Sequence, residues 1–479
     1  MAEVKKLSHY VGGEWVVGAA VQSSHNPAEP SDIVAEVPAA DSDLLHVAAD
    51  VGAEAGEEWA SATPEVRADC LHRVSEHLDA RREEIADLLS REQGKVIAEA
   101  HGEVVRASRI FRYFAGEAVR RHGLALDSVR PGVDVHTRRE AVGLFALVTP
   151  WNFPLSIPAW KTAPALAFGN SVVLKPAGPT PAIADALARA IDAAGVPAGV
   201  FNLVYASGSS TNALLEHPAV RGISFTGSTS VGQSIGDGAI RRQQRIQLEM
   251  GGKNALVILD DADLDTAVRC ALDGAFFGTG QRCTASSRLI VTDAIHDRFV
   301  AAFSAAVSAL RVGDPRNPDV QVGPVATSGQ FENILGYIEI ARSEGAVIAA
   351  GGGPVKGEGQ GYFIRPTLLT GCSPDMRSSC EEIFGPVASV LRVADYEGAL
   401  ALANATPFGL SAGIVTRSLA SARDFQRRAR AGMVMVNLPT AGVDYHVPFG
   451  GTKQSSYGPR EQGFAAVEFY TTQKTIYVA

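Results

Sequence analysis

The sequence has few of the features that mark specialised classes of protein. It contains only five cysteines among 479 residues, widely spaced and with no C-x-x-C pair. Disulfide-rich secreted domains and zinc clusters use closely spaced cysteines, so we expect neither, no metal site, and a reducing cytoplasmic location. Basic residues are outnumbered by acidic ones, 43 to 52, which gives a formal net charge of −9. This balance argues against nucleic acid or an anionic membrane as a partner.

Uninterrupted apolar runs are also missing. The N-terminal stretch MAEVKKLSHYVGGEW has lysines but no apolar segment after them, so we expect no secretory signal. The one long uncharged run, residues 141–160, is broken by Pro150, Pro154 and Pro158. It predicts a buried strand followed by a loop rather than a membrane helix. The composition, 46% hydrophobic and 20% charged, is that of an ordinary folded soluble protein.

The hydrophobic periodicity changes along the chain. Residues 41–94 and 102–123 have apolar residues at helical spacing and predict amphipathic surface helices. From Val142 onward, short apolar runs alternate with helical stretches, and a second such series runs from Asn254 to about Pro439. Strands separated by helices are typical of parallel sheets, so we expect an α/β fold with two or three domains. The strand candidates of the first series are VGLFALVTP, SVVLKPA, VFNLVYA and GISFTG.

Polar motifs follow these predicted strands, at the sheet edge where parallel α/β folds bind ligands. Asn152, in TPWNFP, is either an ordinary turn residue or a hydrogen-bond donor to an oxyanion. The turn FTGSTSVG, with Gly227 and Gly232, is able to present backbone N–H groups to a pyrophosphate. By itself this turn is weak evidence, because it matches neither the G-x-G-x-x-G fingerprint nor a P-loop.

Two further residues are candidates for chemistry. Cys283 lies in the polar, glycine-rich stretch FFGTGQRCTASSR, whereas a buried cysteine is usually only a small apolar filler. A nucleophilic cysteine needs partial exposure and a positive charge or helix dipole that favours its thiolate. Glu249, in QLEMGGKN, is either a solvated carboxylate or a general base whose apolar flanks raise its pKa.

Together these motifs resemble those of the aldehyde dehydrogenase superfamily. The resemblance covers essentially the whole chain, and the motifs keep the family's order: PWNFP, LKPA, FTGS, LEMGGKN, GQRC, EEIFGP and PFGG-x-K-x-S. It implies that Cys283 attacks the aldehyde to form a thiohemiacetal, whose oxyanion is held by Asn152 and the Cys283 backbone N–H. Hydride transfer would leave a thioester, and Glu249 would activate the water that hydrolyses it. Lys175 completes the implied catalytic set.

The resemblance also implies a nicotinamide dinucleotide cofactor. Lys175 and Glu382 would bind its two riboses, and Phe384 would lie near the nicotinamide. Many NAD-preferring members carry an acidic residue three positions after the KP lysine, where this chain has Gly178. A 2′-phosphate would meet less repulsion there, so NAD or NADP is expected. The implied cofactor-binding residues are Trp151, Lys175, Gly178, Gly227, Ser228, Gly232, Glu382 and Phe384.

Two stretches, GAFFGTGQRCTASSRLIVT and GMVMVNLPTAGVDYHVPFGGTKQSSYGPREQG, resemble the α-ketoglutaric semialdehyde (2,5-dioxopentanoate) dehydrogenases of that family. Such a substrate carries a carboxylate remote from its aldehyde, so its pocket should contain a cation, ideally an arginine. Arg106 and Arg282 are the candidates, although Arg106 is equally well explained as solvated and Arg282 as pointing away from the pocket. Phe153, Ile157 and Trp160 are the expected apolar wall.

Other functions stay open on the sequence alone. The enzyme alternatives are a broader succinic or glutaric semialdehyde dehydrogenase and an aromatic aldehyde dehydrogenase. A CoA-acylating enzyme is disfavoured because those relatives usually lack the base that Glu249 supplies. The alternative outside enzymes is an inactive structural relative.

The resemblance implies a Rossmann-type cofactor domain, an α/β catalytic domain and a small β oligomerisation element. We expect the cofactor domain in residues 1–120 and 141–250 and the catalytic domain in residues 251–448. The oligomerisation element would comprise residues 121–140 and 449–479, where the final segment EFYTTQKTIYVA is expected to be a strand. A homodimer or homotetramer follows from the family, and the sequence does not choose between them.

Overall fold

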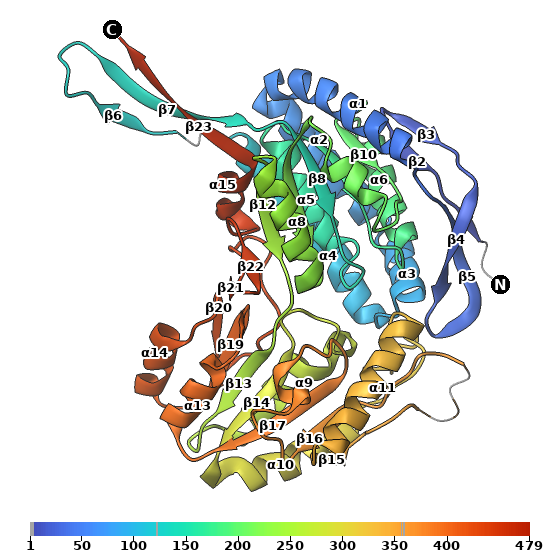
Figure 1. The fold of residues 1–479 in the computed structure, drawn as a ribbon, viewed down its shortest axis with the longest axis vertical. Coiled ribbons are helices and arrows are strands. Elements are labelled where there is room, and N and C mark those ends of the chain that lie inside the picture. Colours follow the sequence, from blue (N-terminus) through green and yellow to red (C-terminus); the bar gives the residue numbers. More distant parts are fainter. Residues whose placement is uncertain (1–3, 121–122, 356, 358–359) are drawn as a thin grey trace.

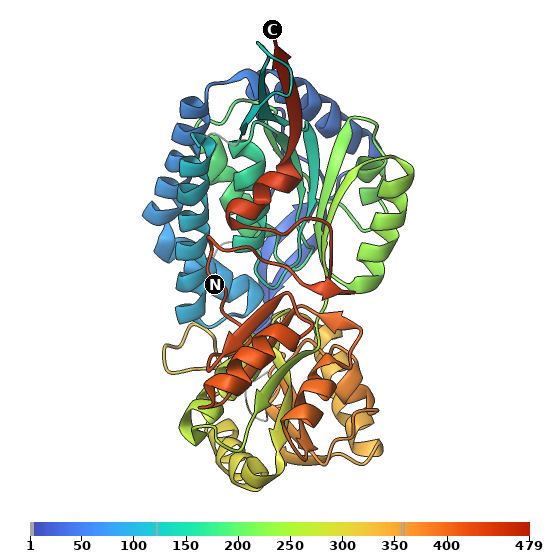
Figure 2. The ribbon, with the colours of Figure 1, turned by 90° about the vertical axis from the view of Figure 1, so that its left-hand side faces the viewer.

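The computed structural model describes residues 4–120, 123–355, 357 and 360–479. Two large sheets lie in separate halves of the molecule, and a thin β arm extends from one of them (Figures 1 and 2). No helix in the described part of the chain is both long and apolar enough to cross a membrane. The predicted α/β class is therefore confirmed, with helices on both faces of each sheet.

The first sheet has eight strands, of which the five central ones are parallel. The strand β8 shows how its two faces form, because alternate residues of a strand point to opposite sides. Phe145 and Leu147 pack in the core on one face, and Leu144, Ala146 and Val148 pack in the core on the other. In spatial order the strands are β22 (Ser456–Tyr457), β12 (Arg245–Glu249), β11 (Val220–Thr226), β8 (Leu144–Val148), β9 (Ser171–Lys175), β10 (Phe201–Leu203), β2 (His9–Val11) and β3 (Glu14–Val16).

Helices cover both faces of this sheet. The predicted amphipathic stretches form four helices, and Asp41 and Thr63 cap the first two by accepting backbone N–H groups. The helices are α1 (Ser42–Ser61), α2 (Pro64–Ala80), α3 (Arg82–Gln93), α4 (Ile97–Ala118), α5 (Ser156–Ala167), α6 (Pro181–Ala193), α7 (Thr211–Leu215) and α8 (Thr229–Arg241). A small sheet of β1 (Lys5–Lys6), β5 (Glu29–Pro38) and β4 (Ala20–Asn26) lies beside them.

The second sheet has seven strands and begins directly after the first, because residues 250–253 join β12 to β13. Its strands are β15 (Val347–Ala350), β16 (Thr367–Thr370), β17 (Val387–Val393), β14 (Ser286–Thr292), β13 (Asn254–Ile258), β19 (Ser411–Val415) and β20 (Met433–Val436). Its helices are α9 (Leu264–Phe276), η1 (Phe277–Gly280), α10 (Asp293–Ser308), α11 (Ser328–Ser343), α12 (Arg377–Cys380), α13 (Tyr396–Asn404) and α14 (Leu419–Arg428). The pair β18 (Phe408–Gly409) and β21 (Thr452–Lys453) lies at its edge.

The arm in Figure 1 is a three-stranded sheet of β6 (Ala125–Asp127), β7 (Asp134–Ala141) and β23 (Thr471–Val478). The oligomerisation element predicted from the sequence included all of residues 449–479, and its first residues, 121 and 122, lie outside the described part of the chain. In the structure only β23 enters the arm. The preceding η2 (Gly463–Ala465) and α15 (Ala466–Tyr470) include three residues, 468–470, that the sequence assigned to a strand.

Aromatic contacts explain why the segment before β23 stays on the first sheet. The rings of Phe469 and Tyr470 lie 5.1 and 4.9 Å from that of Phe145 on β8, and both side chains are buried. β22 pairs with β12 in the same sheet. Burying two large aromatic rings stabilises this position by several kcal/mol, about 1.5–3 for each ring. The boundaries given above for the cofactor and catalytic domains remain predictions.

Substitution of Gly222 on β11 tests how tightly the residues of the first sheet pack. A Cβ at Gly222 would lie 2.2 Å from Cε1 of Phe145, whereas a Cβ at Gly116 on α4 would meet no atom within 4 Å. We expect Gly222→Ala to lower the free energy of unfolding by about 1–3 kcal/mol through overpacking. Gly116→Ala should be neutral or stabilising, by up to about 1 kcal/mol, because alanine favours the helix. Thermal unfolding of both variants measures the difference, and equal melting temperatures would contradict this account.

Candidate active site

A cavity of about 370 Å³ lies between α4, α5, η1 and the segment around residues 442–449. It brings together Cys283 and all five residues that the sequence analysis selected for the substrate: Arg106, Phe153, Ile157, Trp160 and Arg282. Arg106 is therefore not a freely solvated arginine of α4. Arg282 also lines the cavity, although its guanidinium donates to the Asp273 and Gly274 carbonyls. Most of the accessible wall is apolar, and the three selected hydrophobic residues lie side by side along α5 and the loop before it.

Cys283 is half-buried in the loop between η1 and β14. Thr279 and Gly280 just before it have left-handed backbones, with φ of 56° and 65°. A Cβ at Gly280 would lie 2.2 Å from the Gly385 carbonyl oxygen, so only glycine fits where these two loops cross. The Asn254 amide donates to the Cys283 carbonyl at 2.8 Å and fixes the other end of the loop.

The electrostatic setting of Cys283 differs from the expectation. Burial, together with the nearby carboxyls of Glu382 and Glu249, raises the pKa of the Cys283 thiol to about 12. A positive charge favouring the thiolate had been expected from the sequence. Acidic side chains from two other motifs instead lie close to the sulfur, because the chain folds those motifs against the same loop. The thiol is therefore the stable form at neutral pH in the protein alone.

Asn152 lies in the loop after β8 and is buried. Its side-chain amide donates to the Gln281 carbonyl at 3.0 Å, two residues before Cys283. A carboxamide has two N–H donors, so this bond leaves the second one for another acceptor. Asn152 thus connects the first sheet to the loop of the candidate nucleophile, although it does not line the cavity itself.

Glu249 is the last residue of β12 and is also buried, behind the cavity wall rather than on it. Burial raises the pKa of Glu249 well above its usual value, and the negative charge of Glu461 raises it further. Ser456 donates to its carboxylate at 2.6 Å. The raised pKa suits a group that has to accept a proton at neutral pH.

Lys161 and Glu461, which were not predicted from the sequence, form a buried ion pair close to Glu249. The Lys161 ammonium also donates to the Ser224 hydroxyl at 2.7 Å. Lys95, Glu99 and Glu103 were missed as well, although all three line the cavity. The signal was present in the helical pattern, because Glu103 shares an apolar helix face with Ala100, Val104 and Ala107.

Polar groups at the C-terminal ends of the parallel strands lie in one row. The register pairs Phe225 with Val148, Val148 with Lys175, and Thr226 with Glu249. Burial lowers the pKa of the Lys175 amine, which has no hydrogen-bond partner among the described residues. The buried hydroxyls of Thr149 and Thr226 have none either. Unpartnered donors at this edge are what a dinucleotide with many oxygens would require.

The turn after β11 continues this row. Ser228 is the N-cap of α8, whose first N–H groups point outward from the helix as potential donors to an anion. Gly227 lies just before it, where a Cβ would come within 2.5 Å of the Phe225 ring. At Gly232 local packing requires a glycine, because a Cβ there would lie 2.6 Å from the sulfur of Met250. Both glycines thus let α8 approach the sheet closely.

On the side of the second sheet, Glu382 and Phe384 line a small void of about 20 Å³. The Gly252 backbone donates to Glu382 at 2.8 Å, and burial raises the pKa of Glu382 to about 7. The rings of Phe384 and Trp151 are perpendicular, with centroids 5.5 Å apart. These two rings therefore join the row of strand ends to the Glu382 loop.

Gly178 lies a short distance along the chain from Lys175. A Cβ there would meet only the side-chain oxygen of Gln22, at 3.8 Å, which is ordinary contact. The position therefore has room for a side chain, and the polar neighbour Gln22 was not selected from the sequence.

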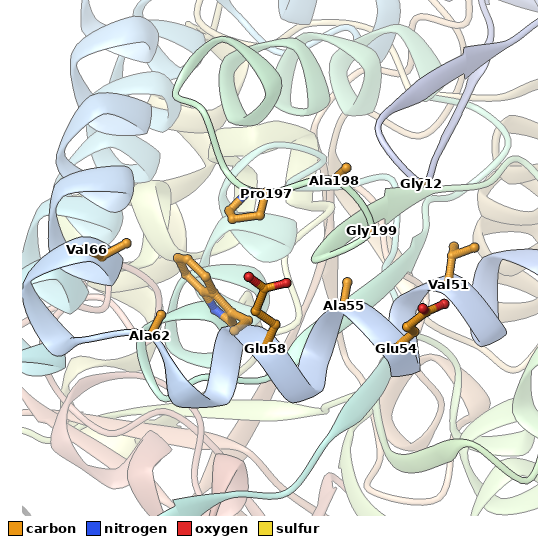
Figure 3. Close-up of a pocket in the computed structure, with 11 residues that line it drawn as sticks. Gly12, Val51, Glu54, Ala55, Glu58, Ala62, Val66, Pro197, Ala198 and Gly199 are labelled. Atoms are coloured by element: carbon orange, nitrogen blue, oxygen red, sulfur yellow. The ribbon is translucent and has the colours of Figure 1, made fainter.

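A larger hollow of about 470 Å³ lies elsewhere, between α1 and residues 197–199 (Figure 3). Glu54 and Glu58 lie along its α1 side. Its lining has no cysteine, histidine, lysine or arginine, so it offers no nucleophile and no cation. The cavity at Cys283 is the candidate active site because it combines a nucleophile with two arginines.

Comparison with known proteins gives one family over the whole chain. A sequence model described as the aldehyde dehydrogenase family matches residues 15–476. The alpha-ketoglutarate semialdehyde dehydrogenase of Haloferax volcanii is 42% identical over 98% of both chains. The alpha-ketoglutaric semialdehyde dehydrogenase of Bacillus subtilis is 40% identical over 100% of this chain and 99% of its own. A crystal structure of Staphylococcus aureus betaine aldehyde dehydrogenase with NAD+ has a TM-score of 0.95 at 32% identity, covering 98% of this chain and 94% of its own.

The raised pKa of the Cys283 thiol predicts how fast an alkylating agent modifies it. Without cofactor, the rate of iodoacetamide labelling at Cys283 should rise about tenfold for each pH unit between about 7 and 9, because only the thiolate reacts. Mass spectrometry of the peptide containing Cys283 separates its labelling from that of the exposed Cys380. A rate that levels off below pH 8 would show a low-pKa thiolate and contradict the electrostatic account.

Proposed function

The chain belongs to the aldehyde dehydrogenase family, and from that premise we propose that it oxidises α-ketoglutaric semialdehyde to 2-oxoglutarate with NAD or NADP. Oxidation of an aldehyde is the activity of the family. The narrower substrate is supported by the relatives named above and by one observation in this structure: Cys283 shares its cavity with two arginines. Guanidinium groups recognise carboxylates, so an aldehyde with a remote carboxylate matches this lining better than a neutral one does.

The proposed mechanism starts at the Cys283 sulfur. After its proton has passed to solvent water, the sulfur attacks the aldehyde carbon, and the oxygen of the resulting thiohemiacetal becomes negatively charged. The free N–H of the Asn152 amide and the backbone N–H of Cys283 stabilise this oxygen. When bound, the oxidised nicotinamide supplies the hydride acceptor. Cys283 is then left as a thioester, and Glu249 accepts a proton from the water that cleaves it.

The groups at the strand ends support the proposed cofactor site. Lys175 and Glu382 would bind ribose hydroxyls, and the α8 N-terminus with Gly227 and Ser228 would face the pyrophosphate. Trp151 and Phe384 would border the nicotinamide. The carboxyls that raise the pKa of Cys283 also suit a positively charged ring, because they make the local potential negative. Gly232 also packs closely against Met250, and it stays a predicted cofactor contact.

Of the two arginines, Arg106 is the better receptor for the substrate carboxylate. Arg282 lies 3.5 Å from Asp273 and is near the buried Glu99, so its charge is already compensated. Arg106 makes no ion pair among the described residues, and its partners are the neutral Val443 carbonyl and Gln462 amide. Its Nε is buried without a partner, as is the Nε of Arg282, so the difference between the two arginines lies in the ion pair with Asp273. An unpaired buried guanidinium gains most from an incoming anion.

The arm supports the proposed homodimer or homotetramer. β23 lies at the edge of its three-stranded sheet, and most of its residues are exposed. One edge of β23 pairs with β7 of its own chain over eight residue pairs. Its other edge still has unpaired backbone groups, which favour addition of a strand from a second copy.

Initial rates of NAD(P)H formation test the substrate assignment. We expect kcat/KM for α-ketoglutaric semialdehyde to exceed that for benzaldehyde by about tenfold or more, equivalent to about 1.4 kcal/mol of transition-state preference. Succinic semialdehyde, with a shorter carboxylate arm, should fall between them. Arg106→Ala should raise KM for the acidic aldehydes far more than for benzaldehyde.

The matched control is Arg109→Ala, which removes an exposed arginine from the same helix. It should leave all three substrates nearly unchanged. Comparable rates of the wild type with all three aldehydes would reduce the assignment to a general aldehyde dehydrogenase. A larger KM effect from Arg282→Ala than from Arg106→Ala would move the carboxylate site to Arg282.

A negative charge introduced at position 178 should change the preference between NAD and NADP. The space beside Gln22 accommodates a side chain, so Gly178→Glu should fold normally. Its carboxylate would repel a 2′-phosphate and accept hydrogen bonds from a free ribose hydroxyl. We expect kcat/KM with NADP to fall about tenfold or more relative to that with NAD, while Gly178→Gln changes the ratio much less. An unchanged ratio in both variants would place the adenosine ribose elsewhere.

A further inference from the structure

A buried ion pair lies on the cavity wall next to Asn152. Lys95 lies between α3 and α4, and Glu103 lies one and a half turns into α4. Their side chains are 4% and 1% exposed and are joined by a hydrogen bond from the ammonium to Oε2 of Glu103. Neither residue has a role in the mechanism above.

The second oxygen of Glu103 binds the start of α5. Its Oε1 accepts the backbone N–H groups of Leu155 and Ser156, both at 3.0 Å. These N–H groups have no acceptor within the helix, and α5 has no side-chain cap of its own. A carboxylate at this end is also favoured by the helix dipole. Glu103 therefore anchors the C-terminal end of the loop that carries Asn152.

Lys95 holds the other end of the same short segment. Its ammonium donates to the backbone carbonyl of Asn152 at 3.1 Å and lies 3.9 Å from the centre of the Phe153 ring. The ion pair thus contacts the backbone at residues 152, 155 and 156. The Asn152 side chain starts from this fixed backbone and reaches Gln281 at 3.0 Å. A small shift of the loop would turn the free amide N–H away from the Cys283 loop.

Stability alone does not explain an ion pair in this place. Buried ion pairs lose hydration, and replacing both partners with apolar residues of similar size is often neutral or stabilising. Catalysis, in contrast, depends on donors that are held in place before charge develops, because misplacement by about 1 Å reduces rates strongly. The ion pair satisfies that requirement for Asn152.

We propose that Lys95 and Glu103 are positioning residues, which fix the Asn152 backbone so that its amide meets the thiohemiacetal oxyanion. The proposal rests on the role of Asn152 in the proposed function. It concerns the chemical step, so the pair should affect kcat and leave the binding of aldehyde and cofactor nearly unchanged.

A double-mutant cycle tests the proposal in the full-length protein. Lys95→Met combined with Glu103→Leu removes both charges together, so no unpaired buried charge remains. We expect kcat to fall about 10- to 100-fold, with KM for aldehyde and cofactor changing less than about threefold. In an Asn152→Ala background the same pair of substitutions should lower kcat less than about threefold further, because the donor they position is already absent.

Two further variants provide a conservative substitution and a control. Glu103→Gln keeps an oxygen acceptor for Leu155 and Ser156 but loses the charge, and should lower kcat in the same direction by a smaller factor even if the double variant is unstable. Arg91→Met with Asp32→Asn is the matched control, because it removes another buried ion pair at α3. Its folded fraction should have wild-type kcat.

The outcomes separate the two proposals. Unchanged kcat in Asn152→Ala alone would overturn the proposed role of Asn152. A kcat loss in Asn152→Ala, followed by an equal loss from the pair in both backgrounds, would overturn the positioning role and leave the proposed function standing. A rise in KM restricted to acidic aldehydes would also overturn it, because Lys95 would then bind the substrate carboxylate directly.

Discussion

The hydrogen bond from the Asn152 amide to the Gln281 carbonyl joins the two halves of the molecule at the candidate site. One partner lies after a strand of the first sheet, and the other lies in the loop that leads to the second sheet. The direct link from β12 to β13 brings the C-terminal strand ends of the first sheet to the N-terminal strand ends of the second. The proposed nucleophile, oxyanion donor and base therefore come from different elements and meet only at this junction.

Several buried carboxyls lie close to Cys283 at this junction. Glu249, Glu382 and Glu461 raise the pKa of the Cys283 thiol, and burial raises the pKa of Glu249 and Glu382 in turn. Such a group of carboxyls is costly to ionise together in a buried place. A positively charged ligand would relieve that cost and lower the thiol pKa at once. The proposed oxidised cofactor has this charge, so its binding and the activation of Cys283 would be coupled.

On the opposite side of Cys283 the cavity is mostly apolar, with charged groups placed by ion pairs and helix ends. Lys95 and Glu103 compensate each other and bind backbone, and Arg282 lies beside Asp273. Arg106 makes no ion pair among the described residues, although Glu103 and Asp444 lie within electrostatic reach of it. The cavity therefore contains paired charges that hold the loops in place and one arginine whose hydrogen-bond partners are neutral, which is available to a substrate carboxylate.

Elements and motifs with local signals could be predicted from the sequence. Apolar runs bounded by glycine and proline predicted β8, β9, β10 and β11, and the glycine-rich polar setting of Cys283 singled it out from the other cysteines. What these elements bury follows from contacts between distant parts of the chain. Lys161 and Glu461 are 300 positions apart, and Lys95 contacts a carbonyl 57 residues away. Helical periodicity reports that one face is covered but not what covers it, so buried charges, their partners and the pKa shifts they cause appear only once the chain is folded.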